Sequence, residues 1–116
     1  AELALGGRAL DAPGWFVEPT IFTGTRPDMR IVREEIFGPV LCVQRFGDDE
    51  LATVARAAND TIYGLSGSVW TRDVAVAHRM VRLIDAGQVS INCHAAVDPS
   101  IPFGGNRQSG WGREMG

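Results

Sequence analysis

The sequence predicts an α/β domain. Between residues 40 and 92, apolar or alternating segments typical of strands take turns with segments of helical periodicity, and the connections between them are short. Strand, helix, strand, helix, strand in that order favours parallel pairing through right-handed crossovers. We therefore expect a parallel βαβαβ sheet with flanking helices, followed by a glycine-rich C-terminal loop region over residues 93–116.

The segments before residue 40 are expected to be less regular. Residues 14–22 combine aromatic and β-branched side chains but include Pro19, which cannot donate to a central ladder. An edge or irregular strand is predicted there. Residues 29–37 form a second extended or half-helical stretch, which ends at Gly38 and Pro39.

The first strand and helix of the βαβαβ core follow directly. Residues 40–46 form a mostly apolar strand, and Asp48 is the expected N-cap of a helix over residues 49–59. Asp49 and Glu50 fall in its first turn, where the helix dipole favours anions. The predicted inward positions are Leu51, Val54, Ala55 and Ala58, and the predicted outward positions are Thr53, Arg56 and Asn59.

The rest of the core repeats this pattern. A strand over residues 65–70 leads to a helix whose buried stripe is Ala77, Met80, Val81 and Ile84. Gly87 is expected to end that helix as a left-handed cap. A third strand, residues 88–92, alternates apolar and polar side chains.

Composition excludes several classes of function. The 116 residues suffice for one domain with a real core, and a net charge of −3 argues against a nucleic-acid partner. All 11 basic residues are arginine, which excludes a Schiff-base lysine and a Walker lysine. This bias favours a GC-rich bacterial gene as the source.

The cysteines and the apolar runs indicate a cytoplasmic protein. Cys42 and Cys93 lack the CxxC spacing of zinc or redox motifs, so we expect neither a metal site nor disulfide chemistry. The first residues lack the pattern of a signal peptide, and no run approaches the roughly 20 apolar residues that span a membrane. We expect no membrane partner.

Several local features invite a functional interpretation and do not support it. The glycines of residues 104–112 fit neither a Walker loop nor a dinucleotide fingerprint, so they are expected to serve tight turns. Cys93 and His94 are adjacent and diverge at the end of a strand, unlike a nucleophile and its base. Cys42 is expected to be a small buried hydrophobe, and His78 has no partner at ligand spacing.

Two adjacent glutamates are the most interesting acidic residues. Glu34 and Glu35 point to opposite faces in an extended chain, so at most one of them can enter a site. A carboxylate beside a glycine-proline turn can accept hydrogen bonds from both hydroxyls of a ribose. The alternative is a solvated or ion-paired surface glutamate.

A set of motifs, nearly end to end and in a fixed order, resembles the aldehyde dehydrogenase superfamily. The motifs are residues 34–40 (EEIFGPV), 59–61 (NDT), 63–65 (YGL), 102–105 (PFGG), 109–110 (SG) and 112–114 (GRE). Residues 14–20 resemble the family's strand just upstream of these, and Asn92 resembles an asparagine at the end of its last parallel strand. The resemblance implies the second half of the family's catalytic domain.

The resemblance also implies roles for individual residues. It assigns Glu35 to the nicotinamide ribose and Phe37 to the nicotinamide ring of NAD or NADP. It assigns Phe103 to an aromatic position near the substrate tunnel and Val97 to a position where relatives often carry an aromatic residue, so a wider tunnel wall is expected. Arg107 replaces a lysine common in the family. Residues 94–100 resemble the loop of members that oxidise arylacetaldehydes.

In this family a cysteine thiolate attacks the aldehyde, a hydride passes to NAD or NADP, and a glutamate activates water to hydrolyse the thioester. Neither Cys42 nor Cys93 matches the nucleophile, and Glu34 and Glu35 do not match the base. We therefore expect a single partial catalytic domain over residues 1–116, truncated at both ends and inactive alone, from a parent enzyme that is a homo-oligomer. The alternative is a separate, non-catalytic remnant that binds a homologous subunit or a nucleotide.

Overall fold

The computed structural model describes residues 1–47 and 49–116, which form two compact units. Unit 1 comprises residues 1–46 and unit 2 comprises residues 47–116. Each unit is described separately. Within the part of the chain that the structure describes, every helix is too short or too polar to cross a membrane.

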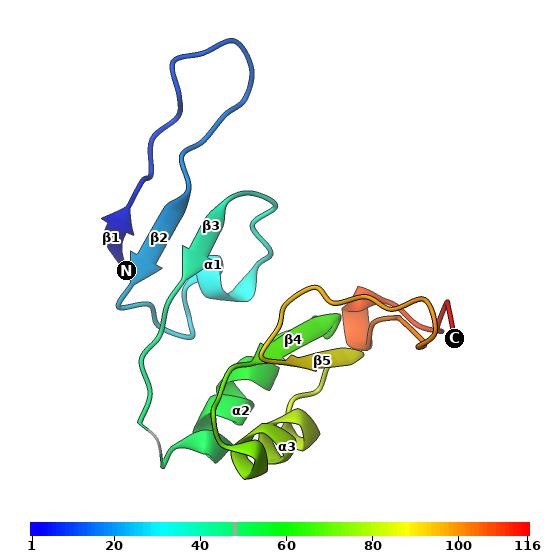
Figure 1. Ribbon diagram of the computed structural model, residues 1–116. Helices are drawn as coiled ribbons and strands as arrows, with labels where there is room; N and C mark the ends of the chain where they lie inside the picture. The colour runs from blue at the N-terminus through cyan, green and yellow to red at the C-terminus, as the bar shows by residue number, and fades with distance from the viewer. Residues whose placement is uncertain (48) are drawn as a thin grey trace. The chain divides into compact units, whose positions relative to one another are not determined.

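Unit 1 is a small mixed sheet with one helical turn (Figure 1). Its elements are β1 (Glu2–Leu5), β2 (Thr20–Thr23), α1 (Arg30–Arg33) and β3 (Val40–Cys42). The strand order is β1-β2-β3, with β1 antiparallel and β3 parallel to β2. The connection between β2 and β3 carries α1, which corresponds to the half-helical stretch expected over residues 29–37.

Of the edge or irregular strand expected over residues 14–22, the edge position is wrong, and residues 14–19 hold only an isolated bridge at Val17. The strand is confined to Thr20–Thr23 and is the central one of the three. Pro19 lies one residue before it, so the ladder loses no donor, and the Thr20 amide donates to the carbonyl of Pro39 at 2.8 Å. The strand β1 was not expected, because all four of its residues are exposed and therefore carry no burial pattern.

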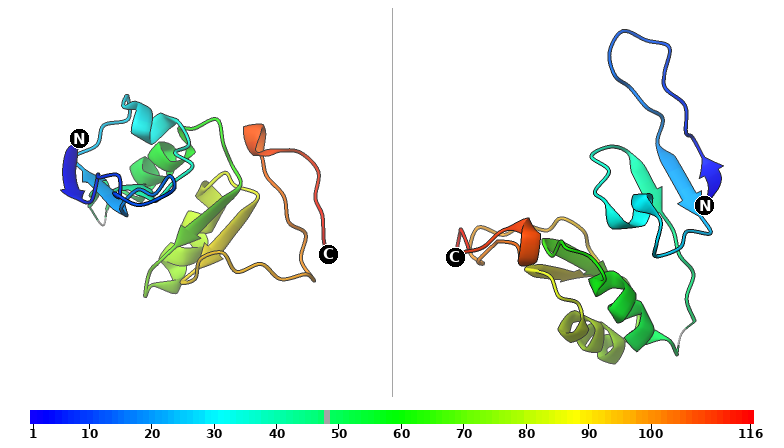
Figure 2. Two further views of the ribbon diagram at one scale, coloured as in Figure 1. Left: turned by 90° about the horizontal axis from the view of Figure 1, so that it is seen from above. Right: turned by 180° about the vertical axis from the view of Figure 1, so that it is seen from behind.

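Unit 2 packs two helices against a pair of parallel strands (Figure 2). Its elements are α2 (Leu51–Asn59), β4 (Ser66–Val69), α3 (Val74–Leu83), β5 (Gln88–Ile91) and a 3₁₀ turn, η1 (Arg107–Ser109). The pairing of β4 with β5 is parallel, so the predicted strand-helix-strand unit is confirmed here. Its core contains Ala55, Val69, Ala77 and Met80, and Val81 and Ile84 are half-buried beside it.

The single βαβαβ sheet expected from the sequence is not the observed arrangement. The ladder partner of β3 is β2, with Thr20 opposite Val40 and Phe22 opposite Cys42, whereas β4 and β5 form a sheet of their own. Strand order depends on which distant segments meet, and a pattern of alternating elements along the chain carries no information on that.

The boundaries of α2 also differ from the prediction. The helix begins at Leu51 instead of residue 49, and Glu50 occupies the N-cap position, where its carboxylate accepts a hydrogen bond from the Gly47 amide at 2.8 Å. The predicted cap, Asp48, lies outside the described residues. Of the predicted inward positions, Ala58 is exposed, although it lies one turn after the buried Ala55.

Two further expectations for unit 2 are wrong. Asn59 does not simply face outward, because its side-chain amide donates to the carbonyl of Leu83 at 2.7 Å and accepts from the Asp85 amide at 2.8 Å. Gly87 is not a left-handed cap: α3 ends at Leu83, followed by an extended residue, and the φ of Gly87 is not positive. Glycine is needed there because a Cβ would collide with the carbonyl oxygen of Gly104.

Candidate functional site

The two adjacent glutamates have different surroundings at the end of the short helix α1. Glu34 follows the last turn in extended conformation and forms an ion pair with Arg30, with Nη2 2.8 Å from one carboxylate oxygen and Nε 2.9 Å from the other. This hydrogen-bonded guanidinium holds the pKa of Glu34 below its usual value. Glu34 is thus an ion-paired surface glutamate, which is one of the two alternatives that the sequence analysis left open for this pair of residues.

Glu35 is exposed, and its carboxylate makes no hydrogen bond or ion pair with any described residue. Phe37, two residues on, is 97% exposed. Both precede β3 directly, and the intervening turn is held by the Gly38 amide donating to the carbonyl of Ile36 at 2.8 Å. An exposed carboxylate can accept hydrogen bonds from two hydroxyl groups, and an uncovered aromatic ring offers a face to a planar ring.

The two residues assigned to the substrate lie together in unit 2. Val97 and Phe103 line one pocket of about 120 Å³, which lies between the segment of residues 94–103 and one face of the β4–β5 pair. That face is polar, and it contributes Ser66, Ser68 and Ser90. The pocket is smaller than the roughly 300–1,000 Å³ of whole-ligand sites, so by itself it has room for one end of a small molecule.

His94 belongs to this pocket and is paired with Ser68, not with Cys93. The imidazole Nδ1 lies 3.0 Å from the Ser68 hydroxyl oxygen. The side-chain amide of Gln88 donates to the carbonyl of Ala96 at 2.8 Å. Sequence reasoning missed these contacts. The sequence shows that polar residues alternate along the strands, but it does not show which loop residues these side chains contact.

Asn92, at the end of β5, has a structural partner. Its side-chain oxygen accepts from the Thr71 amide at 2.9 Å, and its side-chain nitrogen donates to the Thr71 carbonyl at 3.0 Å. The backbone of Asn92 is left-handed, with φ of 53°. These two bonds join the segments that follow β4 and β5 at the carboxyl ends of both strands.

The glycine-rich segment packs through backbone contacts. A Cβ at Gly105 would lie 2.5 Å from the Ser109 carbonyl oxygen, and one at Gly104 would lie 2.5 Å from the Gly112 carbonyl oxygen. Gly110 and Gly112 have φ of 126° and 80°, values that favour glycine. Gly110 and Gly112 thus fit the interpretation as turn formers, whereas Gly104 and Gly105 are required by close backbone approach.

Arg107, within the same segment, joins three parts of unit 2. Its guanidinium donates to the Asp85 carboxylate at 2.6 and 2.9 Å and to the carbonyls of Asn59 and Thr61, each at 2.6 Å. The hydrogen bond from Arg107, and then that from Asn106, hold the pKa of Asp85 below its usual value.

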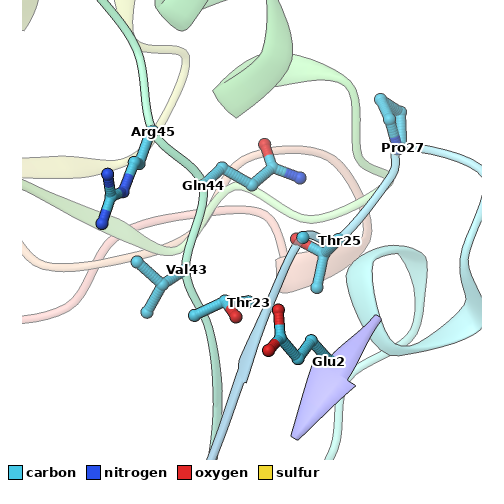
Figure 3. Close-up of a pocket in the computed structure, with 8 residues that line it drawn as sticks. Glu2, Thr23, Thr25, Pro27, Val43, Gln44 and Arg45 are labelled. Carbon is cyan, nitrogen blue, oxygen red and sulfur yellow. The ribbon is translucent and has the colours of Figure 1, made fainter. Parts of the chain in front are cut away.

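A second hollow, of about 500 Å³, lies in unit 1 beyond the carboxyl ends of β2 and β3 (Figure 3). Its lining includes Glu2, Thr23, Thr25 and Arg45, and the hydroxyl oxygen of Thr25 is buried without a hydrogen-bond partner. None of the candidate site residues predicted from the sequence lines it. Among the described residues, no cluster of three His, Cys, Asp or Glu side chains could hold a metal ion.

Comparison with known proteins identifies the family. The model of the aldehyde dehydrogenase family matches residues 1–116. The chain belongs to the aldehyde dehydrogenase family. The resemblance found in the motifs is thereby confirmed over the whole chain.

Individual dehydrogenases show the same relationship. A mitochondrial aldehyde dehydrogenase of Leishmania tarentolae is 46% identical over 116 residues, which are 100% of this chain and 23% of the relative. The crystal structure of an NAD-dependent aldehyde dehydrogenase from Sinorhizobium meliloti matches with a TM-score of 0.93 and 43% identity, over 99% of this chain and 22% of that chain. An indole-3-acetaldehyde dehydrogenase mutant of P. syringae, solved in complex with NAD+ and IAA, matches with a TM-score of 0.91 and 44% identity, over 98% and 23% of the two chains.

The chain thus spans less than a quarter of the length of these aldehyde dehydrogenases. Glu35 and Phe37 belong to unit 1, whereas Val97 and Phe103 belong to unit 2. Val97 and Phe103 line one pocket of their unit, and Glu35 and Phe37 are two residues apart in the chain.

Proposed function

We propose that this segment supplies cofactor-binding and substrate-binding residues to an NAD(P)-dependent aldehyde dehydrogenase, which oxidises an aldehyde to a carboxylic acid through a cysteine thioester. The observation that carries the proposal is the family match over all 116 residues, together with a Glu35 carboxylate that has no partner among the described residues. The chain spans only 22–23% of the length of the proteins described above. This supports the proposal that the nucleophile and the general base lie outside this chain.

Glu35 is proposed to bind the cofactor through its ribose. The carboxylate is exposed and has no partner among the described residues, so two ribose hydroxyls can donate to it without breaking an existing bond. A charged acceptor gives shorter and stronger hydrogen bonds than a neutral one. The exposed ring of Phe37 offers the face against which a nicotinamide packs. NAD or NADP, when bound, accepts the hydride from the substrate.

Val97 and Phe103 are proposed to contact the aldehyde. Both line the pocket of about 120 Å³, and Val97 is 51% exposed, so an incoming apolar group can still bury it. An arylacetaldehyde is the favoured substrate class. The similarity of this chain to the P. syringae indole-3-acetaldehyde dehydrogenase supports this choice.

The two cysteines of this chain are proposed to have no part in the chemistry. The Cys42 thiol donates to the carbonyl of Ile31 at 3.4 Å, and Cys93 is half-buried. The 116 residues alone are therefore proposed to be inactive. A bacterial source, a cytoplasmic location and a homo-oligomeric parent enzyme belong to the same proposal.

The test is a comparison of two proteins. A dehydrogenase that contains this segment should reduce NAD or NADP when phenylacetaldehyde is added, and absorbance at 340 nm reports the rate. The 116-residue chain should show no rate with either cofactor. Oxidation by the short chain alone would overturn the division of roles. Binding of NAD to the short chain, with no activity in the longer protein, would favour the non-catalytic remnant.

A further inference from the structure

The segment that carries Val97 is tied to the β4–β5 sheet at two points. Ser68 in β4 shares a hydrogen bond with Nδ1 of His94 at 3.0 Å. Gln88 in β5 donates from its side chain to the carbonyl of Ala96 at 2.8 Å. Val97 follows the second tether directly, so its backbone position is set by these two contacts.

The two tethers arise from the alternation of side chains along the strands. Val69 and Val89 point to the helices and belong to the apolar core of unit 2. The alternate positions therefore face the other way, toward the pocket, and there they are serines and Gln88. The parallel register places Ser68 beside Ser90 and Ser66 beside Gln88, so the polar face is continuous across both strands.

A polar face of this kind holds a loop by hydrogen bonds and contributes little apolar burial. Ala95, Ala96 and Val97 are all exposed, and Val97 retains 51% of its accessible surface. Hydrophobic stabilisation scales with the apolar area removed from water, so burial of these side chains adds little. The conformation of the segment thus depends on the tethers from Ser68 and Gln88.

The bond between His94 and Ser68 does not require one particular state of the imidazole. A serine hydroxyl both donates and accepts, so it can donate to an unprotonated Nδ1 or accept from a protonated one. What the bond does require is a polar atom attached to Cγ of residue 94. Asparagine retains such an atom, and alanine does not.

We propose that His94 and Gln88 are positioning residues that set the aldehyde selectivity of the enzyme by holding Val97 over the sheet. The inference rests on the proposed function, because that function assigns Val97 and Phe103 to the substrate. Both residues line the pocket together with Val97, and the role assigned to them here is to hold the loop, through the bonds from His94 to Ser68 and from Gln88 to Ala96. Release of either tether lets the wall formed by Val97 move, which weakens the binding of a substrate large enough to touch that wall.

The first experiment compares two aldehydes of different size in the dehydrogenase that contains this segment. The His94→Ala variant should lose about tenfold in kcat/KM for phenylacetaldehyde through a higher KM, and should change little for acetaldehyde. His94→Asn should restore most of the loss. His78→Ala, at the other, exposed histidine on α3, is the matched control and should behave as the wild type.

A purely structural role would give a different pattern. It would lower the amount of active enzyme, and kcat would then fall equally for both aldehydes. An unchanged ratio of the two kcat/KM values in His94→Ala would overturn the proposal, and so would a failure of asparagine to restore it. Ser68→Ala removes the hydrogen bond between Ser68 and His94 by changing the other partner. It replaces His94→Ala in the experiment if that variant does not fold. The double variant should then resemble either single variant.

A second measurement keeps the inference separate from the proposed function. In the dehydrogenase that contains this segment, prepared with labelled methyl groups, Ser68→Ala and His94→Ala should move the NMR signals of the Val97 methyls in the same direction, and His94→Asn should not. If the dehydrogenase oxidises no aldehyde, only the proposed function fails, and these signals still decide the positioning. Val97 signals that are identical in all variants would overturn it.

Discussion

The guanidinium of Arg107 donates two hydrogen bonds to one carboxylate oxygen of Asp85, from Nη2 at 2.6 Å and from Nε at 2.9 Å. The same guanidinium donates from Nη1 to the carbonyls of Asn59 and Thr61. One side chain therefore joins the end of α2, the segment between α3 and β5, and the glycine-rich segment that follows Phe103. A lysine, which the family resemblance leads one to expect at this position, offers a single ammonium without the fixed planar set of donors.

The first prediction concerns the loss of the hydrogen bonds that the Arg107 guanidinium donates. Arg107→Ala leaves two backbone carbonyls and a carboxylate to water, and both partners of the ion pair are already partly exposed, with side-chain exposures of 33% and 46%. Solvent screens such a pair, so we expect a thermal midpoint lower by several degrees and no loss of the fold. The thermal midpoint of Arg107→Lys should lie between those of the wild type and Arg107→Ala. A scan of the unfolding transition by circular dichroism measures this, and an alanine variant as stable as the wild type would contradict it.

The second prediction is a pH dependence carried by Asp85. The hydrogen bond from Arg107 lowers the pKa of this carboxyl, so the charged form is favoured in the folded state. Its contribution to stability is therefore present above the unfolded pKa of about 3.9 and is lost as the pH falls through the lower, folded pKa.

The measurement is the urea midpoint of the wild type and of Asp85→Asn between pH 2 and pH 7, roughly the range over which aspartate titrates. The difference between the two proteins should be largest near neutral pH and should shrink below about pH 4. When Arg107→Gln is also present, the difference in urea midpoint caused by Asp85→Asn should depend much less on pH. A difference that grows toward acid would show that the sign is wrong.

Local periodicity explains why parts of unit 2 could be predicted. The stripe of Ala77 and Met80 recurs at helical spacing, and the structure buries both residues on α3. The alternation of Val89 and Ile91 with polar neighbours likewise identified β5. These patterns are short in range, so each helix or strand can be identified from its own residues.

Several of the features that could not be predicted depend on distant partners. The pairing of β3 with β2 joins segments some 20 residues apart, and nothing in either segment specifies the other. Gly87 had an obvious local role as a helix cap, yet its actual constraint is the carbonyl of Gly104. The contact between Ser68 and His94 spans 26 residues. Glu35 and Phe37 could be singled out only from their motif, since an exposed glutamate has no signature of its own.

The third prediction tests that constraint on Gly87. A methyl group there would collide with the carbonyl oxygen of Gly104, which is backbone and cannot rotate away. We expect Gly87→Ala to lower the free energy of unfolding by about 1–3 kcal/mol, as overpacking does. Gly38→Ala is the control, because the added methyl meets only a methyl of Ile36 at 4.0 Å. Equal effects of the two substitutions on the urea midpoint would show that the close approach is not a constraint.

The fourth prediction addresses the cofactor. In the dehydrogenase that contains this segment, Glu35→Gln replaces a charged acceptor with a neutral amide, and we expect the KM for NAD or NADP to rise about tenfold. Glu34→Gln is the matched control, since Glu34 is already bonded to Arg30 and its loss should leave that KM unchanged. Initial rates at varied cofactor concentration measure both. An unchanged KM and kcat in Glu35→Gln would remove Glu35 from the cofactor site.

The last prediction concerns the core that supports the pocket. Met80 is 5% exposed and packs with Ala55 and Val69, so it joins α3 to α2 and to β4. Met80→Ala removes buried methylene groups and leaves a cavity, which costs about 2–5 kcal/mol. Small domains have only about 5–15 kcal/mol of stability in total, so the variant should unfold at a much lower urea concentration. Leu83→Ala, on the same helix but 39% exposed, should cost far less. If the two variants unfold at the same urea concentration, the cluster around Met80 is not the core of this unit.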